Sequence, residues 1–283
     1  MLTLTPKIPV PERILCFGAA GSGKSNNVLQ IMRKLPNKKF YIVDNDLAYY
    51  RMMAEEYPDV LERGNYQLYE VDSGDWVAQL EAAEAASRAC GEGDWYVFDM
   101  VTETWEACQA WYSEQIYSKD IADFFLDKRL ELEHRREEGR AALAAGAKDA
   151  KIPGNIVVFD QLTDWGYINK QYKKLYRTFL DVNHKKAHLY VTAEATKVNQ
   201  GADDQDTITE FGPYLFKPKG QKRMRHLFHT VILMKHPSKD KWTGTSIGKD
   251  RGRPTFVDKP ITDFATDYLV GVAGWKPGVV PDA

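Results

Sequence analysis

The chain has 283 residues, of which 43% are apolar, so it is long enough for one large α/β domain or two modest ones with a sizeable core. Its formal net charge of −2 excludes a global attraction to nucleic acid, so any such binding must come from a local patch. The three cysteines lack CxxC spacing, which excludes a disulfide framework or a zinc site, and no apolar run approaches the roughly 18 residues that span a bilayer.

The first motif is a glycine loop between a predicted strand and a predicted helix. Ile14–Phe17 is a short apolar run typical of a buried strand, and Gly18–Ser25 fits G-x-x-x-x-G-K-[ST] at every fixed position. Inward-pointing backbone N–H groups and the start of the next helix bind a polyphosphate. Lys24 is expected to reach the β- and γ-phosphates, and the Ser25 hydroxyl to complete a Mg²⁺ shell. The predicted nucleotide site consists of Gly18, Gly21, Ser22, Gly23, Lys24, Ser25 and Asn26.

Strands and helices then alternate as far as residue 99. The apolar runs predict strands at Lys39–Val43, Tyr66–Val71 and Trp95–Phe98. Helices are predicted from Ala48 to Tyr57 and from the capping residue Asp75 to about Ala89. This alternation predicts an α/β fold with a mostly parallel central sheet and helices on both faces.

An acidic residue ends two of the apolar runs. Asp99 closes Trp95–Phe98, and Asp160 closes Ile156–Phe159. A carboxylate at the tip of a strand beside the phosphate loop can orient the metal and its water shell. We prefer Asp99, because it ends an uninterrupted βα series, whereas Asp160 follows a long insertion. For either residue, the alternative role is a cap for the next helix.

The insertion covers about residues 118–151 and is rich in charge and alanine. It predicts a helical excursion with solvated faces, either a simple hairpin or an arm that binds a protein partner. Asp164 to His184 then predicts one long helix, and its aromatic stripe is most simply explained by core packing.

Next, His188–Val191 predicts a strand that ends at Thr192-Ala193-Glu194. If this strand neighbours the first one, those polar groups would lie next to the γ-phosphate. The segment 195–225 follows and is basic towards its end. Its cations are candidates for binding single-stranded nucleic acid, although a solvated surface loop is an equal alternative: Lys197, Lys217, Lys219, Lys222, Arg223 and Arg225.

The C-terminal part predicts antiparallel strands at Leu227–Met234 and Trp242–Ile247. A basic turn, Lys249-Asp250-Arg251-Gly252-Arg253, comes immediately afterwards. The residues from Trp275 to Ala283 carry several glycine and proline breakers and predict an extended tail.

In their order along the chain, these pieces resemble the RecA-like ATPase core of strand-exchange recombinases and DnaB-type helicases, and in particular the compact phage-encoded RecA-like proteins. The resemblance rests on the phosphate loop, Tyr41–Ala48, the strand ending in Asp99, and Lys249–Pro254. It covers roughly residues 13–99 and 187–255, and it excludes the charged insertion. It implies a single RecA-like domain that carries this insertion. The dispersed cysteines and an N-terminus without a basic-then-apolar signal pattern predict a cytoplasmic location, in the host cytoplasm if the chain is phage-encoded.

The resemblance also implies roles for individual residues. Asp46 falls where the family has a glutamate that polarises the attacking water, with Glu103 or Glu194 as second choices. Lys249 and Arg251 resemble the K-x-R fingers that hexameric members supply from a neighbouring subunit. Two positions depart from the family pattern: Asp46 is one methylene shorter than glutamate, and Thr192-Ala193-Glu194 lacks the expected glutamine or asparagine sensor.

The function expected from all this is an ATP- and Mg²⁺-dependent ATPase of phage type in DNA recombination or replication, acting on single-stranded DNA as a homo-oligomer. Two alternatives stay open. One is a nucleotide or small-molecule kinase whose basic lid would be 217–225. The other is an ATP-gated packaging or loading protein. The sequence leaves open whether the protein forms a ring, a filament or no oligomer at all, and whether ATP or GTP is preferred.

Overall fold

A computed structural model gives the protein at residues 2–5, 10–154, 159–160, 163–221, 224–247 and 256–279. The chain divides into two compact units, one made of Met1–Trp105 with Leu175–Ala283 and the other of Glu106–Lys174. Two helices, α5 (Val101–Tyr117) and α7 (Asp164–His184), cross this boundary. Each unit therefore contains one part of both helices.

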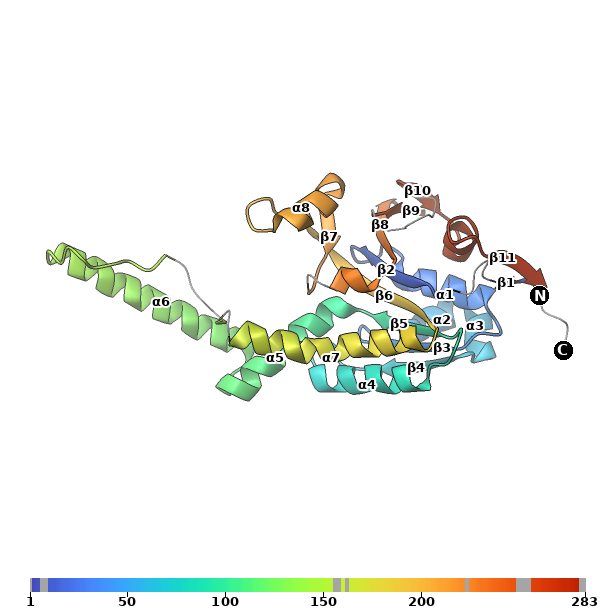
Figure 1. Ribbon diagram of the computed structural model, residues 1–283, viewed down its shortest axis with the longest axis horizontal. Helices are drawn as coiled ribbons and strands as arrows, with labels where there is room; N and C mark the ends of the chain where they lie inside the picture. The colour runs from blue at the N-terminus through green and yellow to red at the C-terminus, as the bar shows by residue number, and fades with distance from the viewer. Residues whose placement is uncertain are drawn as a thin grey trace. The chain divides into compact units, whose positions relative to one another are not determined.

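A mixed sheet organises the first unit (Figure 1). Its strands lie in the order β10 (Lys259–Ile261), β9 (Lys241–Ser246), β8 (Thr230–Ser238), β2 (Arg13–Gly18), β6 (His188–Lys197), β5 (Trp95–Asp99), β3 (Phe40–Asp44) and β4 (Tyr66–Glu70). The strands from β8 to β4 pair in parallel, whereas β9 and β10 continue the sheet antiparallel. The predicted fold class is confirmed, and β6 does neighbour β2, which was the condition for placing Thr192-Ala193-Glu194 near the phosphate loop.

The helices between these strands follow from local signals. They are α1 (Lys24–Lys34), α2 (Tyr49–Glu56), α3 (Pro58–Arg63) and α4 (Trp76–Ala89). The Asp75 carboxylate accepts a hydrogen bond from Ala78 N at 2.9 Å, which caps α4 as predicted. Pro58 does end α2, but it also begins α3, because proline fits the first turn of a helix. That second short helix was not predicted.

The core of the first unit lies between α1 and the sheet. Val28, Leu29 and Ile31 are buried against the strands, and all five residues of β3 and of β5 are buried, as expected for parallel strands covered on both faces. The C-terminal segment completes this core through the π-helical turn η3 (Ala265–Val270). Full burial of one such large apolar side chain contributes about 1.5–3 kcal/mol.

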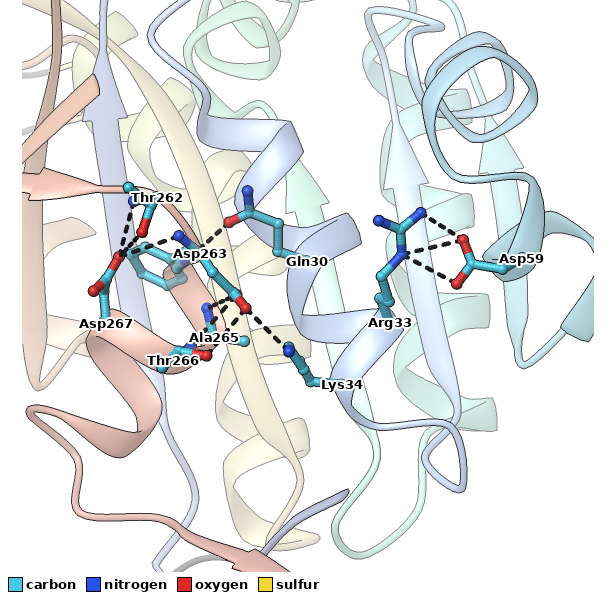
Figure 2. A network of polar contacts seen from close by, with 10 residues as sticks. Gln30, Arg33, Lys34, Asp59, Thr262, Asp263, Ala265, Thr266 and Asp267 are labelled. Carbon is cyan, nitrogen blue, oxygen red and sulfur yellow. Dashed lines mark hydrogen bonds and ion pairs between the residues drawn. The ribbon is translucent and has the colours of Figure 1, made fainter. Parts of the chain in front are cut away.

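The exposed side of α1 is also anchored, as Figure 2 shows. Arg33 Nε donates to Asp59 Oδ2 at 3.0 Å, which ties α1 to α3. On the other flank, Gln30 Oε1 accepts from Phe264 N at 2.6 Å, and Lys34 pairs with Asp263 at 3.3 Å. The helix that follows the phosphate loop is thus held by α3 on one flank and by the C-terminal segment before η3 on the other.

The remaining elements of the first unit are short. β1 (Leu2–Thr5) pairs antiparallel with β11 (Lys276–Val279), so part of the expected C-terminal tail is a strand, and residues 280–283 lie outside the described residues. β6 also pairs with β7 (Phe216–Pro218), after the helix α8 (Gln205–Phe211) and the turn η1 (Gly212–Tyr214). A further turn, η2 (Met224–Leu227), precedes β8.

In the second unit, α6 (Ile121–Ala144) is a largely solvated charged helix with i,i+4 ion pairs such as Arg129–Glu133 and Arg135–Glu131. An aromatic cluster lies at its start, where the ring of Phe124 stacks on those of Tyr117 and Phe159 at centroid distances of 4.3 and 5.4 Å. Within the described ranges, no helix is both long and apolar enough to cross a membrane.

A buried polar group secures the amino-terminal edge of the sheet. The ring of His188 stacks against Trp95, with 4.6 Å between centroids, and its Nδ1 accepts a hydrogen bond from Glu12 N at 2.9 Å. Glu12 in turn accepts from Trp275 Nε1 at 3.1 Å, which ties the C-terminal segment to this edge. Burial, aided by the charge of Lys38, lowers the pKa of His188 to about 3, so the imidazole is neutral.

This histidine predicts a loss of stability in acid. In the unfolded chain, His188 takes up a proton as pH falls below the ordinary His pKa of 6.5. In the folded chain, its pKa is about 3, so it stays neutral over this range and the unfolded state is favoured. The stability present above pH 6.5 should fall by up to about 1.4 kcal/mol per pH unit. Denaturant unfolding of the wild type and of His188→Gln at pH 7 and pH 5 should show a smaller loss of stability between the two pH values for His188→Gln. Equal losses in the two proteins would refute this assignment.

Candidate functional site

The phosphate loop has the backbone conformations that its glycines predict. Gly21 and Gly23 have φ of +71° and +90°, which L-residues rarely adopt. A Cβ on Gly18 would lie 2.4 Å from both Met234 O and Ser22 Oγ. α1 begins at Lys24 without a side-chain cap from Gly23. Ser22 Oγ is buried without a hydrogen-bond partner in the described part of the chain. The free N–H groups at the start of α1 and the unpartnered hydroxyl of Ser22 are both hydrogen-bond donors that a phosphate group on this glycine loop would accept from.

Lys24 lies on the wall of this cradle. Its side chain is buried, and Nζ donates to the carbonyl oxygens of Gly18 at 3.2 Å and Ala19 at 3.1 Å. These two acceptors hold the ammonium group over the loop. Because both are neutral, an anionic phosphate oxygen would compete well for the same donor.

Asp99 lies beside the first turn of α1, at the end of β5. Ser25 Oγ donates to Asp99 Oδ2 at 2.7 Å, Tyr49 OH donates to the same oxygen at 3.0 Å, and Thr192 Oγ1 hydrogen-bonds Oδ1. Burial, with the nearby negative charge of Asp46, raises the pKa of Asp99 above its ordinary value. A cation would reverse this effect. The described residues hold no cluster of three or more His, Cys, Asp or Glu side chains suited to a metal, so a cation here would need phosphate and water ligands as well.

The competing acid, Asp160, lies in the second unit, away from the residues of the phosphate loop in the sequence. Its Oδ1 accepts from Thr163 N at 2.8 Å and Thr163 Oγ1 at 2.9 Å, in the turn that leads into α7. Its carboxylate is therefore engaged in a local turn. Residues 156–158 of the apolar run before it lie outside the described residues.

A cavity of about 510 Å³ opens over the phosphate loop. That volume lies within the range of roughly 300–1,000 Å³ typical of small-molecule sites. All of its lining residues belong to the first unit: Ala20, Gly21, Ser22, Gly23, Lys24, Ser25, Asn26, Asp46, Ala48, Met52, Glu56, Asp99, Met100, Glu194 and Trp242. The structure therefore brings six of the seven predicted nucleotide-binding residues to one cavity, and Gly18 lies directly below it as the last residue of β2.

The three acids considered for water activation differ in position. Asp46 is exposed and lines the cavity, as does Glu194 at the end of the buried part of β6. Glu103 lies in the first turn of α5 and is not among the described lining residues. A fourth acid, Asp44, is fully buried beneath Asp46, and burial raises its pKa to about 8.

Asn45 is a site residue that the sequence did not single out. Its Nδ2 donates to Met100 O at 2.9 Å, and its Oδ1 accepts from Met100 N at 2.6 Å. Gln79 Oε1 accepts a further hydrogen bond from Asn45 Nδ2 at 2.9 Å. Asn45 thus clamps the peptide that follows Asp99. A polar residue at the end of a buried strand was the one available signal.

Trp242 is the second such residue. Its indole Nε1 donates to Gly21 O at 3.3 Å, and its ring stacks on His236 with 4.7 Å between centroids. A Cβ on Gly23 would lie 3.2 Å from the Trp242 ring. The β9 indole therefore packs directly on the phosphate loop, more than 200 residues away in sequence, and no local signal predicted it.

Most of the described basic residues of 195–225 have acidic partners. Lys217 pairs with Asp203, Arg225 with Glu210 at 3.0 Å, and Lys219 with Glu194 at 3.7 Å. Lys197 is exposed. Lys222, Arg223, Lys249 and Arg251 lie outside the described residues.

No protein-family model and no curated protein matches the chain. Among solved structures, it is similar to the RadB recombinase, with 10% identity and a TM-score of 0.46 over 88% of this chain and 86% of that one. It is also similar to a KaiC-like protein from the hyperthermophilic archaeon Pyrococcus horikoshii, with 13% identity and a TM-score of 0.40 over 89% and 85% of the two chains. A third similar structure is the assembled ATPase EscN of the enteropathogenic E. coli type III secretion system, with 12% identity and a TM-score of 0.40 over 80% of this chain and 43% of that one.

Similarities at these identities and TM-scores say nothing about function. The fold is identified by the strand order of the chain itself. The phosphate loop follows β2, β6 separates β2 from the acid-tipped β5, and antiparallel strands extend the sheet beyond β8. This is the strand order of a RecA-like P-loop fold.

Proposed function

We propose that the chain binds ATP with Mg²⁺ in the cavity over the phosphate loop and hydrolyses it. The observation that carries this proposal is the 2.7 Å hydrogen bond between Ser25 and Asp99 at the foot of a cavity that Lys24 also lines. A hydroxyl and a strand-tip carboxylate side by side are the two protein groups that a phosphate-bound Mg²⁺ requires. The test is release of phosphate from ATP, with and without Mg²⁺.

Each residue would have a separate task. Lys24 would exchange its carbonyl acceptors for phosphate oxygens, and Ser25 would contact the metal while Asp99 orients that hydroxyl and the metal's water. A bound Mg²⁺ neutralises charge on the β- and γ-phosphates. Asp46, which is exposed and lines the same cavity, would position the attacking water and accept its proton.

The role of Asp46 predicts a defect in turnover without a defect in binding. Asp46→Asn should lower kcat about 10²–10⁴-fold, the usual contribution of a general base, and leave the ATP dissociation constant nearly unchanged. Glu103→Gln is the comparison, because Glu103 is not among the described residues of the cavity wall. Steady-state kinetics and calorimetry measure both quantities. A larger loss of kcat in Glu103→Gln than in Asp46→Asn would assign the positioning of the attacking water to Glu103.

We propose further that the ATPase acts on single-stranded DNA in recombination or replication, as a phage-type RecA-like protein. The support is positional: the segment 195–225 leaves the nucleotide cavity directly after Glu194, and Lys197 is exposed at the end of β6. Lys217 and Arg225 are paired with acidic side chains, so fewer basic side chains are available to bind DNA phosphates than the sequence alone indicated. The same pairing weakens the kinase alternative, which needs those side chains in a mobile lid.

A binding experiment addresses this part. Anisotropy of a labelled oligonucleotide should show an affinity that falls steeply with salt, and Lys197→Ala should weaken it at every sequence tested. The matched control is Lys39→Ala, an exposed lysine that immediately precedes β3. Absence of binding at low salt would refute the proposal for DNA while leaving the ATPase intact.

Assembly is proposed from the Lys249–Arg251 motif, whose two cations would act on a neighbour's nucleotide. Such a finger supplies about 10³–10⁵ in rate where it operates. Mixing Lys24→Ala with Arg251→Ala subunits should restore part of the ATPase activity, because some interfaces then combine an intact loop with an intact finger. A mixture that stays inactive would exclude fingers acting in trans.

A further inference from the structure

The carboxylate of Glu194 occupies an unusual place for an acid in an anion-binding cavity. Glu194 pairs in register with Gly18, the residue from which the phosphate loop begins, and it lines the same cavity as Ser25 and Asp99. A nucleoside triphosphate would bring several negative charges into this space. A neighbouring carboxylate then repels the terminal phosphate unless a cation accompanies it.

Lys219 is placed to be that cation. Its Nζ lies 3.7 Å from Glu194 Oε2, and its side chain is 42% exposed. Among the described residues that line the cavity, Lys24 is the one basic side chain. Lys219 therefore provides a second positive charge at the edge of the site, next to the acid that most needs compensation.

Hydrogen bonds hold the backbone of Lys219 next to Glu194. Lys219 N donates to Glu194 O at 2.8 Å. Lys219 O accepts from Thr102 Oγ1 at 3.2 Å, and Glu194 N donates to that same hydroxyl at 2.9 Å. Thr102 is buried and lies three residues after Asp99. The backbone of Lys219 is thus tied to Glu194 on β6 and to Thr102 in the first turn of α5, the helix that follows β5.

From this geometry we propose that Lys219 and Glu194 form an element that reads the terminal phosphate. With a diphosphate bound, Lys219 stays paired with Glu194. With a triphosphate bound, Lys219 shares its charge between Glu194 and the γ-phosphate, which selects ATP over ADP within a single chain. This assigns Lys219 to the nucleotide site rather than to a nucleic-acid surface, and it rests on the proposed nucleotide binding.

The test compares the affinities for Mg·ATP and Mg·ADP by calorimetry, using a non-hydrolysable ATP analogue. Lys219→Ala should weaken binding of the triphosphate about 10- to 100-fold, the size of one lost charge-assisted contact, with little change for ADP. Lys219→Arg should keep most of the preference. The matched control is Lys217→Ala, which removes an equal charge two residues away on β7, where Lys217 pairs with Asp203 instead.

Glu194→Gln gives an independent prediction, because it should raise the affinity for the triphosphate or leave it unchanged, whereas Lys219→Ala should lower it. Without the carboxylate, repulsion of the γ-phosphate disappears, so the triphosphate should bind at least as tightly as it does to the wild type, and the cost of Lys219→Ala should shrink in this background. Retained ADP binding shows that each variant is folded.

An equal loss for ATP and ADP in Lys219→Ala, or no loss for either, would overturn the proposal while leaving ATP binding in place. A wild-type chain that binds neither nucleotide would instead refute the proposed function on which the inference rests.

Discussion

Replacing Lys24 by alanine should abolish most of the ATPase activity. The ammonium group is buried at the cavity wall, where its present acceptors are two loop carbonyls. In a site with little water, a fixed donor aimed at developing negative charge contributes more than it would in solution. Loss of one such donor typically lowers kcat about 10²–10³-fold. We expect a fall of at least this size, together with weaker ATP binding, measured by phosphate release and calorimetry.

The control for this variant lies on the same helix. Lys34→Ala removes a lysine from the last turn of α1, where it pairs with Asp263 on the surface (Figure 2). An exposed ion pair of this kind contributes only about 0–1 kcal/mol, so stability should change little and activity not at all. Equal activities of Lys24→Ala and the wild type would show that the cavity does not act through this amine.

Asp99→Asn should change the dependence on Mg²⁺. The carboxylate accepts hydrogen bonds from Ser25 and Tyr49 on a single oxygen, Oδ2, so its charge orients the hydroxyl that would contact the metal. Asparagine keeps an acceptor but removes that charge. Groups that orient a metal ligand typically account for about 10–100-fold in metal affinity or activity. The Mg²⁺ concentration for half-maximal ATPase activity should rise by about that factor.

Asp160→Asn is the matched control, since Asp160 ends the competing apolar run and accepts hydrogen bonds from Thr163 in the turn before α7. Its Mg²⁺ dependence should equal that of the wild type, and the weakened hydrogen bonds should instead appear as about 0.5–1.5 kcal/mol of stability. The opposite result, with the Mg²⁺ dependence altered in Asp160→Asn alone, would transfer the metal-orienting role to that residue.

The predictions that succeeded rest on dense local signals. The glycines and the lysine of the phosphate loop restrict both conformation and chemistry within eight residues, and unbroken apolar runs identified β3 and β5 as strands buried on both faces. Parallel strands place their carboxyl ends at one edge of a sheet, so the meeting of Ser25 with Asp99 follows from the order of elements. α7 matches its predicted bounds, Asp164 and His184, because its apolar residues keep helical spacing.

The features that were missed depend on pairing between distant segments. Trp242 reaches the phosphate loop because β9 is added to the sheet next to β8, and Asn45 reaches Met100 because β3 pairs with β5. The basic segment shows the same difficulty. A sequence displays the charge of Lys217 and Arg225 but not the acids that pair with them, Asp203 and Glu210.

The central claim is that the cradle over α1 holds a triphosphate and a divalent cation. Crystals grown with a non-hydrolysable ATP analogue and Mn²⁺ in place of Mg²⁺ test it most directly, because anomalous scattering locates the metal without reference to activity. We predict one manganese peak about 2 Å from Ser25 Oγ, with Asp99 beside it and Lys24 on the phosphates. A nucleotide bound elsewhere, or a cradle that stays empty at saturating nucleotide with Lys24 still on the carbonyls of Gly18 and Ala19, would contradict the account.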